Sequence, residues 1–298
     1  RAPLAGVGFD GAILRALARR RLVRISSEEV ARDPYGDATF DAPEDLSPSP
    51  EQAEAIREIE ARVGSRAFHA VLLQGVTGSG KTFVYLRALE KALAMGRGAI
   101  LLVPEIGLTA QTVRLFRGAF GDRVAVLHSA LSDGERYDMW RGVLRGDRRV
   151  VIGTRSAVFA PVRDLGLVIL DEEHDPSYKE HDRDPRYHAR DIAVMRAKRC
   201  GAVALLGSAT PSLESDWNGR SGKFERLHLP RRIGNRPLPA VILVDMRREG
   251  GGAIFSKPLR ERIRARVATG ERIILLQNRR GYAPFVQVPW EGSVRGVP

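Results

Sequence analysis

Residues 75–82 have the types and spacing that bind the phosphates of a nucleotide. They read Gly-Val-Thr-Gly-Ser-Gly-Lys-Thr, which matches the P-loop pattern Gly-x-x-x-x-Gly-Lys-Thr. Glycines let backbone N–H groups wrap a polyphosphate, Lys81 reaches its outer phosphates, and Thr82 holds Mg²⁺. The predicted nucleotide-binding residues are Gly75, Thr77, Gly78, Ser79, Gly80, Lys81 and Thr82. A glycine turn without chemistry is the alternative, which the apolar segment before it and the helical spacing after it disfavour.

A run of acids, Asp171-Glu172-Glu173, follows an apolar segment and could supply the carboxylates for hydrolysis. Hydrolysis of a nucleotide needs one carboxylate neutralised by metal and another free to accept a proton. We predict that Asp171 binds Mg²⁺ opposite Thr82, and that Glu172 orients and deprotonates the attacking water. A solvated acidic turn is the alternative. With Lys81, these two acids are the predicted catalytic residues.

Two further predictions concern side chains around this site. His174 lacks the partners of a structural zinc site, and it could instead bridge the ATP site to Ser208 or Thr210 as part of the catalytic group. A lone histidine is more often a satisfied loop or core residue. Gln52, just upstream of the P-loop strand, could read the adenine edge with its paired donor and acceptor. Its alternative is a place on a helix surface.

Two other segments carry groups that suit a nucleic acid. The loop at residues 153–156 offers Thr154, Arg155 and Ser156 to phosphates, although Arg155 could be an ordinary surface charge. Residues 175–190 mix aromatic and charged side chains, and the aromatic ones could stack on unpaired bases while the basic ones face the backbone. The candidates there are Tyr178, Lys179, Arg186, Tyr187, His188 and Arg190. A long solvated loop is the alternative.

The elements that must position these residues alternate between strand and helix patterns. Apolar strands are expected before the P-loop and at residues 99–104, 124–127, 150–152, 167–170 and 203–206, the last of the set. This alternation predicts an α/β fold with a parallel sheet and helices on both faces. Each polar cluster lies at the carboxyl end of its strand, where open α/β sheets bind ligands.

The ends of the chain have different patterns. A helix capped by Asp10 and a strand at residues 22–25 fit the end of a winged-helix unit or a basic arm. We expect that partial unit at residues 1–33, a linker rich in Pro, Asp and Ser at 34–50, the ATP-binding lobe at 51–232, and an incomplete second lobe at 233–298. In the second lobe, strands are expected at residues 239–245 and 272–276, and a helix at 258–267.

Composition limits the class of partner. The sequence has 48 lysines and arginines and 36 aspartates and glutamates, so its net charge is 48 − 36 = +12. Such a charge suits a polyanionic partner such as DNA or RNA, or serves solubility. The single cysteine, Cys200, excludes an internal disulfide and a multi-cysteine zinc site, and we expect it in the core. Without a signal peptide or an apolar run of about eighteen residues, we expect a soluble, cytoplasmic protein with no membrane partner.

Together these residues resemble the PriA family, the bacterial replication-restart DNA helicases of superfamily 2, also called primosomal protein N′. The most specific stretches are Ile106-Gly107-Leu108-Thr109, Arg186-Tyr187-His188-Ala189-Arg190-Asp191 and Asn278-Arg279-Arg280-Gly281-Tyr282. The remaining similar stretches are residues 75–82, 153–159, 171–174 and 207–212. The resemblance spans residues 8–284 and implies a RecA-like P-loop helicase lobe.

The resemblance implies a 3′→5′ ATP-dependent DNA helicase that acts with Mg²⁺ at forked or single-stranded DNA. It implies single-strand DNA-binding protein and primosome proteins as partners, and a place at the nucleoid. The family's fork-binding domain, cysteine-rich zinc module and arginine finger are missing from this sequence, so no zinc site is carried over. An arginine finger is worth roughly 10³–10⁵ in rate, so we expect ATP and DNA binding with slow hydrolysis. A truncated gene, an excised fragment or a degenerate copy would explain the differences.

Two rival functions remain open at this point. One is a non-catalytic remnant that binds DNA or a protein partner and keeps nucleotide binding as a switch. The other is a different P-loop enzyme, such as a transporter ATPase or a small-molecule kinase. The lack of their signature motifs, together with Arg155 and the aromatic segment, disfavours this second rival.

Overall fold

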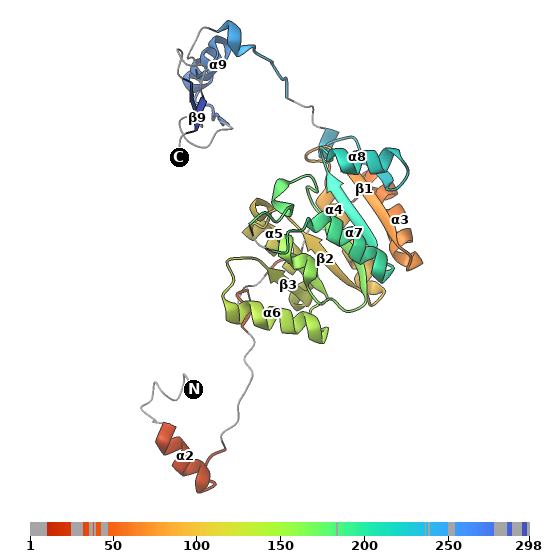
Figure 1. Ribbon diagram of the computed structural model, residues 1–298, viewed down its shortest axis with the longest axis vertical. Coiled ribbons are helices and arrows are strands. Elements are labelled where there is room, and N and C mark those ends of the chain that lie inside the picture. Colours follow the sequence, from red (N-terminus) through yellow and green to blue (C-terminus); the bar gives the residue numbers. More distant parts are fainter. Residues whose placement is uncertain are drawn as a thin grey trace. The chain divides into compact units, whose positions relative to one another are not determined.

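The protein divides into two compact units, residues Arg1–Pro237 and Leu238–Pro298 (Figure 1). The computed structural model describes residues 11–24, 32–35, 38, 40–42, 47–182, 184–235, 237, 239–249, 254–276, 285–287 and 294–296. The capping residue Asp10 and the Asn278–Tyr282 stretch lie outside these described residues. The predicted limits of the winged-helix end, the linker and the two lobes stay predictions.

A seven-stranded parallel sheet forms the centre of the first unit, in the order β3-β4-β2-β5-β6-β1-β7 (Figure 1). The strands are β1 (His69–Gly75), β2 (Gly98–Leu102), β3 (Val124–Leu127), β4 (Val150–Gly153), β5 (Leu165–Leu170), β6 (Val203–Ser208) and β7 (Glu225–Leu229). The near-continuous apolar sequences of β2 to β6 are typical of strands buried on both faces. The predicted α/β fold class is confirmed.

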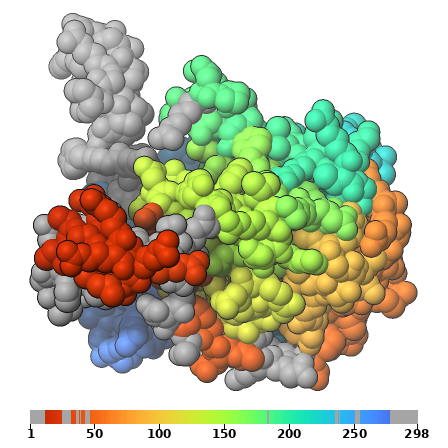
Figure 2. Space-filling model, turned by 90° about the horizontal axis from the view of Figure 1, so that it is seen from below, coloured from red at the N-terminus to blue at the C-terminus, as the bar shows by residue number. Residues whose placement is uncertain are grey.

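Helices cover both faces of this sheet, as predicted. In β1, Val71 and Leu73 join one apolar core with helices α3, α4 and α5, whereas Ala70 and Leu72 join a second core with α6 and α7. Successive strand residues point to opposite faces, which explains this division. The helices are α3 (Pro50–Ser65), α4 (Lys81–Ala94), α5 (Ala110–Phe120), α6 (Asp133–Arg145), α7 (Ala189–Cys200) and α8 (Leu213–Arg220). Figure 2 shows one face of the molecule in space-filling form, with the residues of this sheet and its helices coloured from orange through green to cyan.

The seventh strand, β7, was not predicted, because β6 was expected to be the last of the set. Its sequence Glu-Arg-Leu-His-Leu has few apolar residues and lies at the sheet edge, where only one neighbour is needed. It pairs in parallel with β1, from Val71 opposite Glu225 to Gly75 opposite Leu229. The unpredicted strand therefore lies directly beside the strand that leads into the P-loop.

The N-terminal part contains the predicted helix but not the predicted strand. Helix α2 covers Gly11–Arg19, Arg20 and Arg21 form a turn, and Leu22 to Arg24 have neither helix nor strand structure. Leu22 is 69% exposed, so it has no apolar contact that would hold it in a sheet. The strand prediction at residues 22–25 is wrong for these described positions.

Residues 32–35, where the expected winged-helix end meets the expected linker, are bound to the part of the first unit that contains the sheet. Asp33 accepts hydrogen bonds from Arg117 and Arg148 at 2.8 and 2.9 Å. Tyr35 lies with its hydroxyl 3.4 Å from His128 Nε2 and with its ring 5.7 Å from the Arg117 guanidinium carbon. Since His128 follows edge strand β3, this anchored segment lies along the edge of the sheet. We call these residues, 32–35, the strap.

The second unit has the predicted helix but lacks the two predicted strands. Helix α9 covers Lys257–Ala268, whereas residues 239–245 and 271–276 have neither helix nor strand structure. Leu243 and Ile274 are 93% and 96% exposed, so neither segment has a sheet to pair with among the described residues. Both strand predictions are wrong here. Strands β8 (Phe285–Gln287) and β9 (Val294–Gly296) form an antiparallel pair that was not predicted.

Two remaining sequence-based expectations concern the surface. Cys200 is the last residue of α7 and is exposed, so its predicted place in the core is wrong; the buried positions of that helix are Ala189, Ala193 and Ala197. None of the helices in the described ranges has the length and apolar character needed to cross a bilayer.

Candidate nucleotide and nucleic-acid site

The P-loop and the acidic cluster meet at the carboxyl edge of the sheet. Lys81 Nζ lies 3.4 Å from the carboxylate Oε1 of Glu172 and donates to the Gly75 carbonyl at 3.2 Å. Lys81 is only 8% exposed and follows β1, while Glu172 follows β5. Because parallel strands end at the same edge, two segments ninety-one positions apart (172 − 81 = 91) come together.

The P-loop backbone explains why glycine stands at two of its positions. Gly78 and Gly80 have φ angles of +81° and +82°, which glycine adopts without strain. A Cβ atom on Gly80 would also lie 2.3 Å from the Gln52 side-chain nitrogen. Helix α4 begins at Lys81 with no side chain capping its first N–H groups, which suits an anion at that end. Thr77 and Gly78 are exposed, whereas Ser79 is buried.

The predicted magnesium ligands line one small cavity. Thr82 and Asp171 both border a cavity of about 190 Å³ beneath helix α5. A hydroxyl and a carboxylate fit Mg²⁺, which typically takes one or two protein oxygens and completes its shell with phosphates and water. Among the described residues, no group of three or more His, Cys, Asp and Glu side chains could hold a metal ion.

Two tyrosines hold Asp171 in a nearly dry environment. Burial raises the pKa of the Asp171 carboxyl, and a hydrogen bond of 2.9 Å from the Tyr85 hydroxyl partly opposes that rise. Tyr178 donates to the Asp171 carbonyl at 2.7 Å. Gly207 leaves room for Tyr85, since a Cβ there would lie 1.7 Å from the tyrosine oxygen. Tyr85 thus holds the carboxylate that would bind metal, and Tyr178 holds the backbone of the same residue.

His174 lies between the acids and the end of β6. Its Nδ1 is 2.8 Å from the Ser208 hydroxyl, and its Nε2 is 3.5 Å from Thr210 Oγ1. The same ring lies 3.7 Å from the carboxylate of Glu172. The structure therefore brings His174 together with Ser208 and Thr210, the two residues to which it was predicted to connect the ATP site, although their role in coupling stays a prediction.

Gln52 is buried beneath the P-loop and not on a helix surface. Its Nε2 donates to the Ser79 carbonyl at 2.8 Å, and its Oε1 accepts from the Ser49 N–H at 2.9 Å, closing the capping box of α3. An amide has two N–H donors and two lone pairs, so one of each remains for a base edge. Gln52 borders a pocket of about 450 Å³ opposite Arg232 and Ile233.

Arg155, a predicted phosphate contact, is turned toward residues 175–190, which follow the acidic cluster and which we call the post-acid segment. Its guanidinium donates to the Ser177 and Lys179 carbonyls at 3.2 and 2.7 Å, and it pairs with Glu180 at 2.7 Å. The two predicted nucleic-acid segments are therefore joined to each other. Thr154 is buried beside this contact, whereas Ser156 is exposed.

Two predicted nucleic-acid contacts have little or no exposed surface in this structure, and their contact with DNA stays a prediction. Tyr178 has no exposed surface, because its ring is in the core and its hydroxyl binds Asp171, so it has no face for a base. The side chain of Arg190 is 11% exposed and forms an ion pair of 3.3 Å with buried Glu173. Neither side chain reaches DNA without first leaving its partner.

The other candidates in the post-acid segment keep exposed surface to different extents. Arg186 has a side chain that is 70% exposed, next to Asp184. Tyr187 is half-buried against the Phe159 ring at a centroid distance of 5.0 Å. His188 caps α7 by accepting from the Arg190 N–H, and its backbone pairs with that of Lys179. A contact of these side chains with DNA stays a prediction.

Sequence reasoning missed three contributors to the site. Tyr85 and Glu173 are polar residues whose partners come from distant segments, so no local signal identifies them. The third is the segment after β7, where the Ile233 N–H donates to the Gly78 carbonyl at 3.0 Å. Its arginine pair, Arg231-Arg232, was a sequence signal that could have drawn attention to it.

Known proteins give a consistent comparison. Residues 49–216 match the family model of the DEAD/DEAH box helicases. The chain is 47% identical over 292 residues to the replication restart protein PriA of Bacillus subtilis (strain 168), which covers 97% of the chain and 36% of that protein. It is 44% identical over 306 residues to PriA of Synechocystis sp., covering 99% and 36%. Among solved structures, RecG bound to a three-way DNA junction is similar, with 27% identity, a TM-score of 0.47, and coverage of 62% and 24%.

These matches also define how much of the relatives is represented. The chain spans about a third of the length of the curated relatives that it matches, 36% for both PriA proteins. The family model covers 168 positions (49 to 216), which is more than half of the 298 residues.

Proposed function

The chain belongs to the DEAD/DEAH box helicase family and is of the PriA type, and from this premise we propose that it is the ATP-hydrolysing core of a replication-restart DNA helicase. The observation that carries the proposal is the meeting of Lys81 and Glu172 at 3.4 Å beside the cavity shared by Thr82 and Asp171. A nucleotide-binding loop without hydrolytic chemistry would not need a second carboxylate at that place.

Each residue has a chemical task in this proposal. The P-loop N–H groups and Lys81 hold the β- and γ-phosphates, while Thr82 and Asp171 would hold Mg²⁺, which neutralises phosphate charge when bound. When a phosphate binds Lys81, the Glu172 carboxylate separates from the lysine. The carboxylate can then accept the proton of the attacking water. Gln52 presents its remaining donor and acceptor to the base.

The DNA-directed part of the proposal comes from the relatives and the charge of the chain. We propose 3′→5′ movement on forked or single-stranded DNA, with single-strand DNA-binding protein and primosome proteins as partners at the nucleoid. The net charge of +12 favours a polyanion, and exposed Ser156 and Arg186 lie in the two joined segments that we assign to it.

The test compares the chain with Lys81→Ala in ATP binding and in hydrolysis with and without forked DNA. Charge-assisted hydrogen bonds contribute about 1.5–3 kcal/mol, so we expect nucleotide affinity to fall by roughly 10- to 100-fold. Lys91→Ala, which removes a lysine near the far end of α4, is the matched control and should bind as the parent does. DNA should raise the turnover of the parent and of Lys91→Ala, but not that of Lys81→Ala.

Other outcomes of this experiment separate the alternatives. Nucleotide and DNA binding without turnover would favour a non-catalytic switch of the same family. Equal nucleotide binding by the parent and Lys81→Ala would reject the proposed site altogether.

A further inference from the structure

Glu173 is a fully buried carboxylate that has no task in the hydrolysis chemistry. Its Oε1 accepts from the Ser212 N–H at 2.8 Å, and its Oε2 accepts from the hydroxyls of Ser212 and Ser215 at 3.0 and 2.8 Å. The same oxygen pairs with Arg190 at 3.3 Å. A buried carboxylate is tolerated only when it is paired and hydrogen-bonded, and these contacts supply the partners of Glu173 in the interior.

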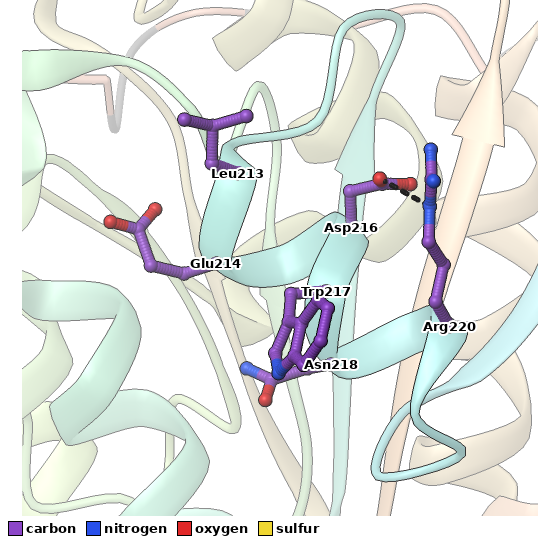
Figure 3. Close-up of a pocket in the computed structure, with 6 residues that line it drawn as sticks. All are labelled: Leu213, Glu214, Asp216, Trp217, Asn218 and Arg220. Carbon is purple, nitrogen blue, oxygen red and sulfur yellow. Dashed lines mark ion pairs between the residues drawn. The ribbon is translucent and has the colours of Figure 1, made fainter.

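These contacts join three elements of the first unit. Arg190 is in the first turn of α7, which follows the post-acid segment, and Ser212 is the N-cap of α8. The Glu173 carboxylate lies at the N-terminus of α8, where the helix dipole favours an anion. Figure 3 shows Leu213, Glu214 and Trp217 projecting from this helix, with Trp217 70% exposed.

On its other side, Glu173 borders the proposed catalytic acid. Glu172 has a φ angle of +45°, a left-handed conformation that non-glycine residues seldom adopt. The two residues that follow Glu172 hold this conformation. The Glu173 N–H donates to the Gly207 carbonyl at 3.0 Å, and His174 contacts Ser208. Such strain persists only where the surrounding contacts determine it.

We propose that Glu173 is a positioning residue that couples the nucleotide state of the P-loop to helices α7 and α8, an inference that rests on the proposed function. In the structure, Lys81 pairs with Glu172. When phosphate binds Lys81, the Glu172 carboxylate turns toward water. The turn that carries Glu172 then moves the Glu173 carboxylate, together with the first turns of α7 and α8 that this carboxylate holds. A movement of α7 or α8 displaces Glu172 by the same route, because coupling between two sites is reciprocal.

The test uses the whole chain and a non-hydrolysable ATP analogue with Mg²⁺, so that turnover is not needed. Amide hydrogen exchange is measured across α7 and α8 with and without the analogue, and a fluorescent analogue reports binding. We expect nucleotide to slow exchange in the first turns of α7 and α8 by at least about fivefold in the parent, the lower end of typical coupling. In Glu173→Gln, this response should be lost, while nucleotide affinity stays within about twofold.

Two further variants make the result decisive. Ser215→Ala removes one hydrogen bond and keeps the Glu173 charge, so it tests the same link with little risk to folding, and its response should be intermediate. Glu214→Gln is the matched control, because Glu214 is exposed on the same helix, 3.6 Å from the same arginine, and should respond as the parent does. A full response in both Glu173→Gln and Ser215→Ala overturns the inference. Failure of the parent to bind nucleotide would instead reject the proposed function.

Discussion

At the scale of single residues, the metal site that we propose depends on the protonation state of Asp171. Its pKa is raised by burial and lowered again in part by the Tyr85 hydroxyl, so the carboxylate competes with protons at a higher pH than an exposed aspartate does. Metal binding requires the ionised form. We therefore expect metal binding above the raised pKa of Asp171, and its loss as the pH falls through that pKa.

The variant Tyr85→Phe should move that loss to higher pH, because it removes the hydrogen bond that favours the ionised carboxylate. A hydrogen bond to a charged group is worth about 1.5–3 kcal/mol, so we expect a shift of roughly one pH unit or more. Titration of Mg²⁺-dependent nucleotide binding between mildly acidic and neutral pH measures it. Tyr137→Phe, at an exposed tyrosine of α6, is the control. An unchanged midpoint in Tyr85→Phe would contradict the role of Tyr85.

At the scale of elements, the P-loop and α3 are fitted to each other through one glycine. Gly80→Ala would place a Cβ at a φ of +82° and 2.3 Å from the Gln52 amide nitrogen, so the loop or α3 must move. We expect nucleotide affinity to fall by at least about tenfold, since strained backbone conformations cost of order 1–3 kcal/mol. Calorimetric titration measures the affinity.

The matched control for this prediction lies in the same region of the chain. Gly64→Ala is within helix α3, where an added Cβ meets nothing within 4 Å. It should leave affinity unchanged and stabilise the fold by about 0.5–1 kcal/mol, the helix preference of alanine over glycine. Equal losses of affinity in both variants would show that the Gly80 geometry is not responsible.

The strap is a second element with a measurable contribution. Burial alone would raise the pKa of Asp33, but the Tyr35 N–H and the two arginines outweigh it and lower the pKa. Asp33→Asn leaves Arg117, with a side chain only 2% exposed, beside a neutral partner. Breaking a buried pair costs about 3 kcal/mol or more, which we expect as the loss in free energy of unfolding, measured by urea denaturation at neutral pH.

The sign of the pH dependence follows from the lowered pKa. Stability from Asp33 is present above the pKa of the unfolded chain and is lost as pH falls through the lower folded value, so the difference between parent and variant should narrow in acid. Asp122→Asn removes a fully exposed partner of the same arginine and should cost far less stability than Asp33→Asn. A similar loss in both variants would mean that the strap is not anchored by Asp33.

At the scale of the whole molecule, every residue that we place at the nucleotide site lies between Gln52 and Ile233, within the first unit. A chain ended after Pro237 should therefore fold alone and bind nucleotide within about twofold of the whole chain. A chain ended after Leu229 loses the hydrogen bond from Ile233 to Gly78 and should bind more weakly. Calorimetry on the two shortened chains measures both affinities, and weak binding by the longer one would assign part of the site to the second unit.

The sequence by itself determined the parallel α/β fold, the P-loop with its helix, and the order of the polar clusters. These features are local: continuous apolar strands, helical spacing, and glycines beside Lys81 and Thr82 appear in short windows of sequence. Edge strands and unpaired segments lie beyond such windows. Strand β7 pairs despite its polar sequence because β1 lies beside it, whereas Leu243 and Ile274 have no such neighbour among the described residues.

Only the tertiary structure decided which polar side chains are free to act on a partner. Tyr178, Arg190 and Glu173 look like exposed charged or aromatic residues in the sequence, but Tyr178 and Glu173 are buried and Arg190 is part-buried, each against a group that is not its neighbour in the sequence. Hydrogen bonds and ion pairs across a sheet edge depend on strand order, which no local pattern contains. The sequence therefore specified the phosphate chemistry, and the packing of α7 and α8 against the end of β5 decided how that chemistry is connected to the rest of the first unit.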